Sequence, residues 1–243
     1  MTFDNIIRLD RVDSTNTRLK ELARQGAAEG TVVLARAQTA GRGTAGRTFF
    51  SPEGEGLYLS VLLRPKAPLE ELLTLTGRAA AAVRQGIENA CGAPCAIKWL
   101  NDLYLNRKKL CGILTELSPD LDYVVLGVGV NLTQTAETFA RQGLGEIATS
   151  LRLEGYAVET EELALSVLQE LERMYRAFPG DKTQYLAQYR AHCLTLGRRV
   201  RFWQDGRPME GTAVGVEENF TLAAECRGRR YTVSSGTVQL MEE

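Results

Sequence analysis

The chain has 243 residues, of which 44% are hydrophobic and 24% are charged, a composition typical of one ordinary globular domain with a small second one. Its formal net charge of -1 argues against DNA binding, because non-specific binding to DNA needs a concentrated basic surface. No apolar run is long enough to span a bilayer and no signal-peptide pattern opens the chain, so we predict a cytoplasmic protein without a membrane partner.

The first quarter of the chain predicts a strand, a helix, a strand, a glycine-rich loop and another strand. Ser14 or Thr15 can cap the helix, which has apolar residues at helical spacing and ends at Gly26 or Gly30. The strands that follow are predicted at 31–37 and 57–63.

The loop at 38–47 contains three glycines and two arginines between the two strands. Glycine allows positive φ and a close approach of backbone to a ligand, while Arg42 and Arg47 can make charge-assisted bonds to phosphate or carboxylate. The loop therefore indicates an anion-binding site, although a plain turn or a solvated basic loop has the same composition.

The middle of the chain predicts a long buried helix at 69–91, because Ala and Leu recur at helical spacing up to Gly92. Short turns then separate three apolar runs, which favours hairpin pairing and a mixed or antiparallel sheet. These runs lie at 96–100, 110–117 and 123–132. Residues from about 136 to 192 predict helices, the clearest at 161–178 and 183–191.

After Gly197 the pattern changes to alternating strands punctuated by glycine, which predicts a small barrel. The strands are expected at 199–203, 211–216, 220–224, 230–233 and 237–240. We therefore divide the chain into domains at 1–192 and 193–243, and we expect the smaller one to lean on the larger, since about 50 residues bury little core.

The cysteines and the histidine suggest no metal site. Only Cys91 and Cys95 are close in sequence, and no second Cys or His pair accompanies them, so we expect reduced, mostly buried thiols. His192 is the only histidine and no nucleophile motif surrounds it, which favours a structural role.

Four segments, taken in order and spacing, closely resemble biotin protein ligases. They are Asp13-Ser14-Thr15-Asn16, the loop at 38–47, Lys98-Trp99-Leu100-Asn101-Asp102 with the following 107–116, and Gly127-Val128-Gly129-Val130-Asn131-Leu132. The likeness extends from about residue 7 to 234–238, which resembles the end of that family's SH3-like domain. It implies an α+β fold of the class II aminoacyl-tRNA synthetase and biotin ligase type, with a mixed or antiparallel sheet, helices and a C-terminal SH3-like barrel.

The resemblance also implies a two-step ligation. Biotin's carboxylate attacks the α-phosphate of ATP to give biotinyl-AMP, and a lysine of a biotin carboxyl carrier domain, part of a biotin-dependent carboxylase, then attacks the acyl carbon. Both steps bring negative charge together, so cations, Mg²⁺ and preorganised donors are needed where charge builds. Lys109 matches the family's catalytic lysine, and Arg42 and Asp102 match further catalytic positions, Asp102 near the incoming carrier lysine.

Two sets of binding residues follow from the same resemblance. Those matched to biotin are Ser14, Thr15, Asn16, Gln38, Arg42, Gly43, Thr44, Lys109 and Gly112. Those matched to the nucleotide are Arg42, Arg47, Phe49, Asn101, Lys109 and Asn131. Ser14 and Thr15 are also good helix caps, Asn131 is also a plausible turn residue, and Lys98 fits either the rim of the nucleotide site or a structural ion pair. Trp99 favours core packing.

Three positions depart from the family pattern. Thr44 replaces a second arginine that helps to retain the adenylate, Phe49 replaces a tryptophan that stacks on adenine, and Leu100 replaces a proline. We expect that the enzyme either leaks biotinyl-AMP or uses Arg47 in place of the missing arginine. Cys111 lies near Lys109 in sequence, and we expect a buried, inert thiol there.

Two other functions compete with this hypothesis. A lipoate ligase or octanoyl transferase resembles the fold, but those relatives typically lack the arginine loop and the C-terminal barrel. A non-catalytic vitamin or adenylate binder is the second alternative, against which the retained Lys109, Arg42 and Asp102 argue. The resemblance suggests the short class without a DNA-binding arm, with a homodimer formed through edge strands as one option, and the glycine content predicts a mobile loop at 39–48.

Overall fold

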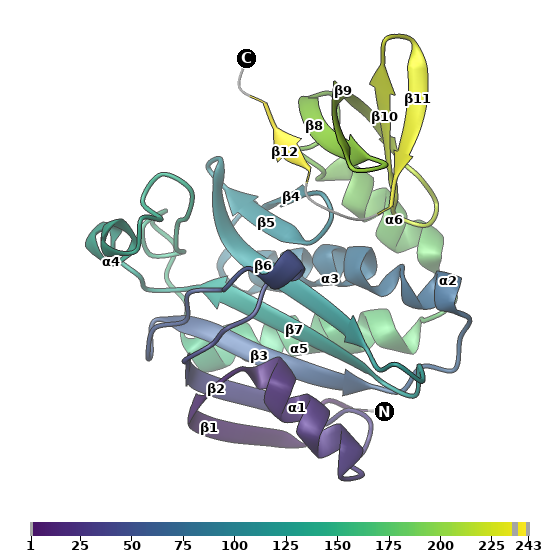
Figure 1. Cartoon of the computed structure of the whole chain (residues 1–243). Helices are drawn as coiled ribbons and strands as arrows, with labels where there is room; N and C mark the ends of the chain where they lie inside the picture. The colour runs from purple at the N-terminus through teal and green to yellow at the C-terminus, as the bar shows by residue number, and fades with distance from the viewer. Residues whose placement is uncertain (1, 235–237, 242–243) are drawn as a thin grey trace.

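The computed structural model describes residues 2–234 and 238–241, which form a seven-stranded sheet and a five-stranded sheet with helices packed around the larger one (Figure 1). The strands of the large sheet are β1 Ile6–Val12, β2 Val32–Gln38, β3 Gly56–Leu63, β4 Ala96–Lys98, β5 Asp102–Leu105, β6 Lys108–Leu117 and β7 Val124–Asn131. The helices are α1 Thr15–Arg24, α2 Leu69–Leu72, α3 Leu75–Cys91, α4 Ala136–Arg141, α5 Thr160–Arg176 and α6 Lys182–Ala191, with a 3₁₀ turn, η1, at Thr44–Gly46. The predicted α+β class is confirmed.

The large sheet is mixed because its connections differ in length. Its order is β1-β2-β3-β7-β6-β5-β4, and β1 and β2 are parallel because α1 carries the chain back between them. The remaining pairs are antiparallel, as the short turns predict.

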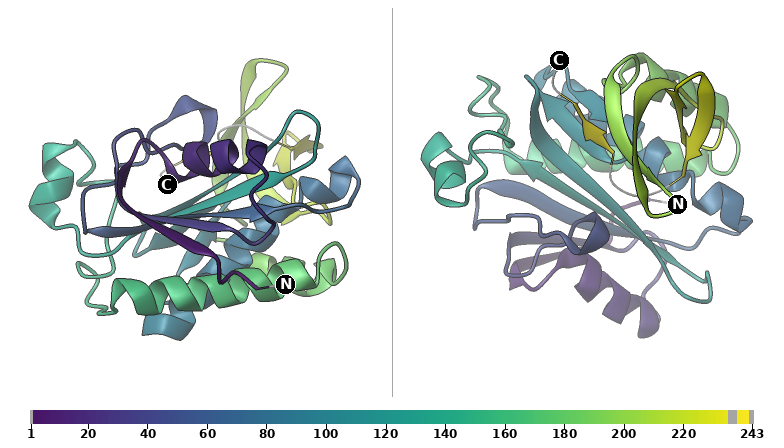
Figure 2. Two further views of the ribbon diagram at one scale, coloured as in Figure 1. Left: turned by 90° about the horizontal axis from the view of Figure 1, so that it is seen from below. Right: turned by 45° about the horizontal axis from the view of Figure 1, so that its top comes forward.

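Helices cover both faces of the sheet, which explains why every residue of β3 and β7 is buried (Figure 2). Alternate residues such as Leu57, Leu59 and Val128 belong to the main core with α3 and α5. Leu62 and Val125 point to the opposite face and pack with α1 in a second, smaller cluster. The candidate site lies on the same second face, where β6 and β7 contain glycine at positions 112, 127 and 129.

The long helix predicted at 69–91 is wrong in one respect, since it is divided into α2 and α3. At the division the backbone N–H of Thr74 donates to the carbonyl of Glu71, and the Thr74 hydroxyl donates to the same carbonyl at 2.7 Å. Threonine side chains that bond to nearby carbonyls compete with the regular helical pattern. A local side-chain bond thus interrupts an apolar pattern that runs on without a break.

Two further predictions need correction: the strand at 96–100 and the run of helices from about residue 136. The predicted strand 96–100 ends at Lys98, and the chain turns and pairs with itself as β5, a strand that the sequence pattern did not reveal. The expected run of helices from about 136 contains only the short α4 before α5 begins, because Gly143 and Gly155 adopt positive φ in the intervening turns.

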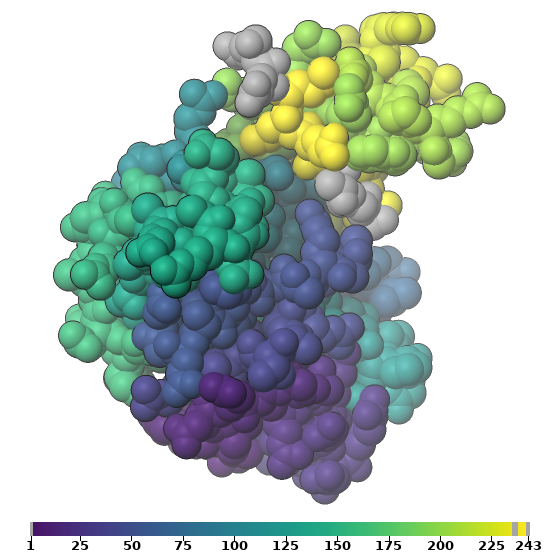
Figure 3. All heavy atoms as spheres, turned by 60° about the vertical axis from the view of Figure 1, so that its left-hand side comes forward, coloured from purple at the N-terminus to yellow at the C-terminus, as the bar shows by residue number. Residues whose placement is uncertain are grey.

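The C-terminal strands form the small sheet, which projects as a separate lobe (Figure 3). Their bounds are β8 Arg199–Gln204, β9 Arg207–Val216, β10 Leu222–Cys226, β11 Arg229–Val233 and β12 Gln239–Leu240. The order is β11-β10-β9-β8-β12, which fits an SH3-like domain. Part of the predicted end motif, 235–237, lies outside the described residues, and the domain boundary at 192 falls at the end of α6.

Arg78 is a fully buried cation at the start of α3 that ties three segments together. Its guanidinium donates to Glu71 of α2 at 2.9 Å and to the carbonyls of Pro179 and Gly180 at 2.8 and 2.7 Å. It also lies 4.9 Å from the centre of the Phe178 ring. A buried charge with these partners is costly to remove, because its loss leaves two carbonyls without this donor and removes one of the two cations paired with Glu71.

We expect Arg78→Met to lower the free energy of unfolding by about 3 to 5 kcal/mol, as is typical when one partner of a buried ion pair is removed. Urea unfolding followed by circular dichroism measures the change. The matched control is Arg18→Met, because Arg18 is paired only with Glu21 on the exposed surface of α1 and should change little. Equal stability of the two variants would contradict the role given to Arg78.

Candidate active site

A row of paired residues crosses the strands on the face opposite α3 and α5. Lys98 pairs with Asp102, Asp102 with Gly112, Gly112 with Gly129, and Gly129 with Tyr58. Directly paired residues of neighbouring strands share one face of a sheet. The row therefore places two charged groups beside two glycines, which leave the space above their backbone open to groups from other segments.

A β-bulge turns Lys109 onto this face. The register of β5 and β6 shifts between Leu103 and Tyr104, so that Lys109 and Gly112, three residues apart, share the same side of the sheet. The Cε of Lys109 lies 3.4 Å from where a Cβ on Gly112 would be. In regular alternation an odd separation would place the two residues on opposite faces.

Lys109 forms an ion pair with Asp102 at the centre of the site. The distance from Nζ to the Asp102 Oδ1 is 2.7 Å, and the Asp102 side chain retains only 15% of its exposure. The carboxylate of Asp102 thus holds the ammonium group of Lys109 in place. The resemblance gave these two residues separate catalytic roles, and the bulge brings their side chains together.

Lys98 increases the positive charge around this ion pair. Burial lowers the pKa of Lys98, the charges of Lys109 and Arg47 lower it further, and Asp102 opposes them. The Lys98 Nζ lies 3.4 Å from the hydroxyl of Tyr104 and over its ring, so its immediate partner is a phenol. Burial, together with the charge of Asp102, raises the pKa of Tyr104 to about 12, which keeps the phenol protonated.

A narrow slot with a volume of about 20 Å³ opens beside the ion pair. It is lined by Ser14, Thr15, Asn16, Gln38, Arg42, Phe49, Gly112, Leu114, Gly127, Val128 and Gly129. The Phe49 ring lies on the glycine floor: a Cβ on Gly129 would be 2.6 Å from its Cε1, and a Cβ on Gly112 would be 3.2 Å from its Cε2. The slot is thus narrow because an aromatic ring occupies it.

Polar groups at one end of the slot form a connected network. The Gln38 Oε1 accepts hydrogen bonds from the Thr15 amide at 2.9 Å and hydroxyl at 3.2 Å, and Gln38 Nε2 donates to the Ser51 hydroxyl at 2.9 Å. The buried Ser60 hydroxyl lies 2.8 Å from Thr15 Oγ1 and 2.6 Å from Asn16 Oδ1. Ser51 and Ser60 were missed by the sequence reasoning, and only the alternation within β3 pointed to the face that Ser60 occupies.

Ser14 holds the N-cap position of α1, yet its side chain makes no capping hydrogen bond. The residue is 2% exposed and lines the slot. The alternative that Ser14 serves as a helix cap through its side chain is therefore wrong.

The loop at 38–47, called the glycine loop below, folds over the slot and is held by hydrogen bonds between residues close in sequence. The Gly43 amide donates to the Arg47 carbonyl at 2.7 Å, while the Arg47 side chain returns to Thr44, with 2.7 Å to its hydroxyl and 3.1 Å to its carbonyl. A Cβ on Gly41 would lie only 2.7 Å from the Ser51 hydroxyl, so glycine is required for this close approach.

A larger cavity of about 460 Å³ lies between the glycine loop, the loop after β4, the start of α3 and the small sheet. Its polar lining includes Arg47, Glu70, Lys98, Asn101 and Asp102. Cationic and acidic groups therefore face a space that is large enough for a charged ligand, next to the narrow slot.

Asn101 and Asn131 both bond to backbone. Asn101 Nδ2 donates to the Ile113 carbonyl at 2.7 Å, and Asn131 Nδ2 donates to the Thr149 carbonyl at 2.9 Å. Asn131 is 5% exposed and its Oδ1 accepts from Gln134 at 3.3 Å. Both residues thus support neighbouring loops, and their roles toward a nucleotide stay predictions.

The described residues contain no group of three or more His, Cys, Asp or Glu side chains that could hold a metal ion. Within the same residues, no helix combines the length and the apolar character needed to cross a membrane. All five cysteines are unpaired, and Trp99 is 5% exposed, as core packing predicts.

Comparison with known proteins gives this geometry a family. The model of the "Biotin/lipoate A/B protein ligase family" matches residues 9–131, from β1 to the end of β7. The chain belongs to this family. The matched residues include those that line the slot, the loop at 38–47 and the Lys109–Asp102 pair.

Individual relatives agree over most of the chain. The bifunctional ligase/repressor BirA of Bacillus spizizenii is 35% identical over 97% of this chain and 74% of its own length. The biotin–[acetyl-CoA-carboxylase] ligase of Mycobacterium tuberculosis is 35% identical over 93% of this chain and 85% of its own. A structure of biotin protein ligase from Aquifex aeolicus, in complex with biotin and ATP, aligns with a TM-score of 0.79 at 30% identity over 99% of this chain and 100% of that chain.

Cys111 is expected to be inert despite its position two residues from Lys109. The thiol is fully buried, and burial raises its pKa well above the usual range, which the charge of Lys109 does not offset. Brief treatment of the native protein with iodoacetamide at pH 8 should modify the partly exposed Cys91 and Cys226 and spare Cys111. Peptide mapping by mass spectrometry measures this, and early labelling of Cys111 would show that the thiol is activated.

Proposed function

We propose that this chain is an ATP-dependent ligase that attaches biotin to a lysine of a biotin carboxyl carrier domain through biotinyl-AMP. The observation that supports it best is the Lys109–Asp102 ion pair. This pair lies between the slot with its glycine floor and the larger cavity, which the glycine loop lines on one side. A carboxylate bound in the slot and a phosphate bound in the cavity would meet at Lys109. This is the cation that the first step requires.

The slot suits the ureido ring of biotin. Gln38 and Thr15 offer donors and acceptors at one end, and glycine backbone forms the floor, so a flat bicyclic ring could lie on it. Biotin would have to displace Phe49 from Gly112 and Gly129, because the slot is too small while the ring lies there. Once displaced, Phe49 keeps a π-face that can stack on either ligand ring.

The cavity suits the nucleotide. Arg47 and Lys98 line it and can neutralise phosphate charge, while the glycine loop can close over the ligand. Mg²⁺ would arrive with ATP, bound mainly by phosphate oxygens, and Asp102 and Glu70 are the carboxylates in the lining that fit it. Mg²⁺ would supply charge neutralisation between the phosphates.

The second step needs a neutral amine on the carrier. Asp102 is placed to attract the incoming ammonium group, and proton removal by a nearby carboxylate makes the amine nucleophilic. We propose that the reaction takes place in the cytoplasm, in keeping with the unpaired cysteines. Self-association through the edge strand β1 remains a further option.

Mass spectrometry of a carrier domain incubated with the protein, ATP, Mg²⁺ and biotin tests the proposal. We expect addition of one biotinyl mass to the carrier, and Lys109→Gln should slow it by about 100- to 1000-fold, as loss of a transition-state donor typically does. Addition of a lipoyl or octanoyl group from competing acids would favour the other branch of the family. No addition, with biotin still bound, would favour a non-catalytic binder.

We also propose that Arg47 replaces the arginine missing at Thr44. The Arg47 guanidinium donates to the hydroxyl and the carbonyl of Thr44. Its positive charge therefore lies beside position 44, where the family pattern has an arginine. A charge-assisted bond to the adenylate phosphate from there would compensate for the neutral threonine.

We expect Arg47→Ala to raise the rate of biotinyl-AMP release by about 10- to 150-fold, the equivalent of about 1.5 to 3 kcal/mol for one charge-assisted bond. Thr44→Arg should change the rate little, because the phosphate already has its cation. Release of labelled adenylate from the preformed complex measures both. If Thr44→Arg releases biotinyl-AMP at least tenfold more slowly than the wild-type protein, the native loop leaks instead.

A further inference from the structure

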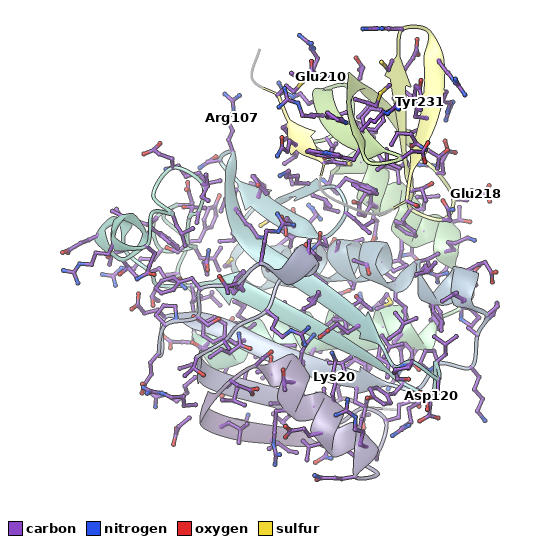
Figure 4. The ribbon with its side chains drawn as sticks, viewed as in Figure 1. Lys20, Arg107, Asp120, Glu210, Glu218 and Tyr231 are labelled. Atoms are coloured by element: carbon purple, nitrogen blue, oxygen red, sulfur yellow. The ribbon has the colours of Figure 1, made fainter. Side chains whose placement is uncertain are left out.

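Glu116, at the end of β6, has two cations on one oxygen. Its Oε1 lies 2.6 Å from Lys20 Nζ of α1 and 3.1 Å from Arg42 Nη2 of the glycine loop. Its Oε2 accepts a hydrogen bond from Asn16 Nδ2 at 2.9 Å. Figure 4 shows Lys20 on the side of α1 near the sheet, so three separate segments meet at this carboxylate.

The carboxylate is largely buried, whereas Arg42 is about half exposed. The Glu116 side chain keeps 17% of its exposure and Lys20 keeps 20%, whereas Arg42 keeps 46%. Burial alone would raise the pKa of Glu116, but the hydrogen bonds from Lys20 and Asn16 and the two positive charges lower it, so the group is ionised at neutral pH. A buried anion therefore holds the guanidinium of a more exposed arginine.

The place where Arg42 rests is the edge of the slot. Arg42 lines the slot together with Gly112 and Leu114, which precede Glu116 at alternate positions on β6 and so share its face. Without the negative charge at Glu116, Lys20 and Arg42 would be two neighbouring cations with no common partner. Their repulsion would favour conformations in which Arg42 leaves the edge.

We propose that Glu116 is a positioning residue that holds the Arg42 guanidinium at the edge of the slot, where it meets the phosphate of the nucleotide already oriented. The inference rests on the proposed function, because Arg42 is one of the residues that the resemblance matches to the nucleotide of that reaction. Preorientation reduces the ordering cost that a flexible arginine would otherwise incur when ATP binds. Glu116 itself touches neither ligand and acts through Arg42.

A double-mutant cycle on the adenylation step tests this role. Pyrophosphate release with biotin and ATP is measured for wild type, Glu116→Gln, Arg42→Gln and the double variant. We expect Glu116→Gln to raise the KM for ATP by about 5- to 20-fold with a smaller change in kcat, in line with the energies of coupled charged neighbours. In the Arg42→Gln background the same substitution should change the KM for ATP by less than about twofold.

Controls separate this role from general damage. Glu53→Gln removes an exposed carboxylate that is paired with Arg11 away from the slot, and its KM for ATP should match wild type. Thermal melting without ligands confirms folding, and Glu116→Asp, which withdraws the carboxylate by one methylene, replaces Glu116→Gln in the cycle if the latter melts early.

The outcomes are distinct. An unchanged KM for ATP in a folded Glu116 variant, or effects of Glu116 and Arg42 that simply add, would overturn the positioning role. Absence of pyrophosphate release in the wild-type protein would overturn the proposed function instead, and the cycle would then have no reference rate. A raised KM that disappears in the Arg42→Gln background supports the proposal.

Discussion

The alternation of side chains along β7 is the constraint on which the site depends. On β7, Leu126 and Val128 belong to the core under α3 and α5, while Gly127 and Gly129 face the other way. Strand β7 thus packs into the core with one set of side chains and leaves its backbone uncovered by side chains of its own at the two glycines. A side chain at Gly127 would collide with Asn16, so the small residue is also what lets α1 approach the sheet.

A bulge adds the charge that this bare surface lacks. In regular alternation Lys109 would face the opposite side of the sheet from Gly112, into the apolar core, and its charge would be unpaired there at a high cost in free energy. The shifted register instead brings its ammonium group to Asp102. With Lys98 and Arg47 nearby, the site holds an excess of positive charge. Such a site attracts anions, including two that would repel one another in solution.

The sequence predicted most elements because each depends on local pattern, such as the apolar spacing of α5 or the alternation in β8. It also identified the loop at 38–47, since glycine and arginine composition is itself the signal. The break between α2 and α3 depends on one hydroxyl bond of Thr74, and the bulge depends on strand register; neither leaves a mark in composition. Glu116 was missed because its partners come from α1 and the glycine loop, about 100 and about 70 residues away, and only the fold unites them.

The small C-terminal sheet takes part in the site through the same segment that supplies Asp102. Trp99 donates from its indole Nε1 to the carbonyl of Phe220 at 2.8 Å, and the Phe220 ring packs edge-on against Tyr189 of α6. The loop that contains Lys98 and Asn101 is thus anchored to the lobe as well as to the large sheet. Because Asn219, Phe220 and Thr221 line the cavity beside Asp102, a shift of the lobe would change the space available to a nucleotide. The connecting chain joins the two sheets as well, because the amide of Leu194 donates to the carbonyl of Ile97 in β4 and the amide of Gly197 donates to the carbonyl of Ala213 in β9.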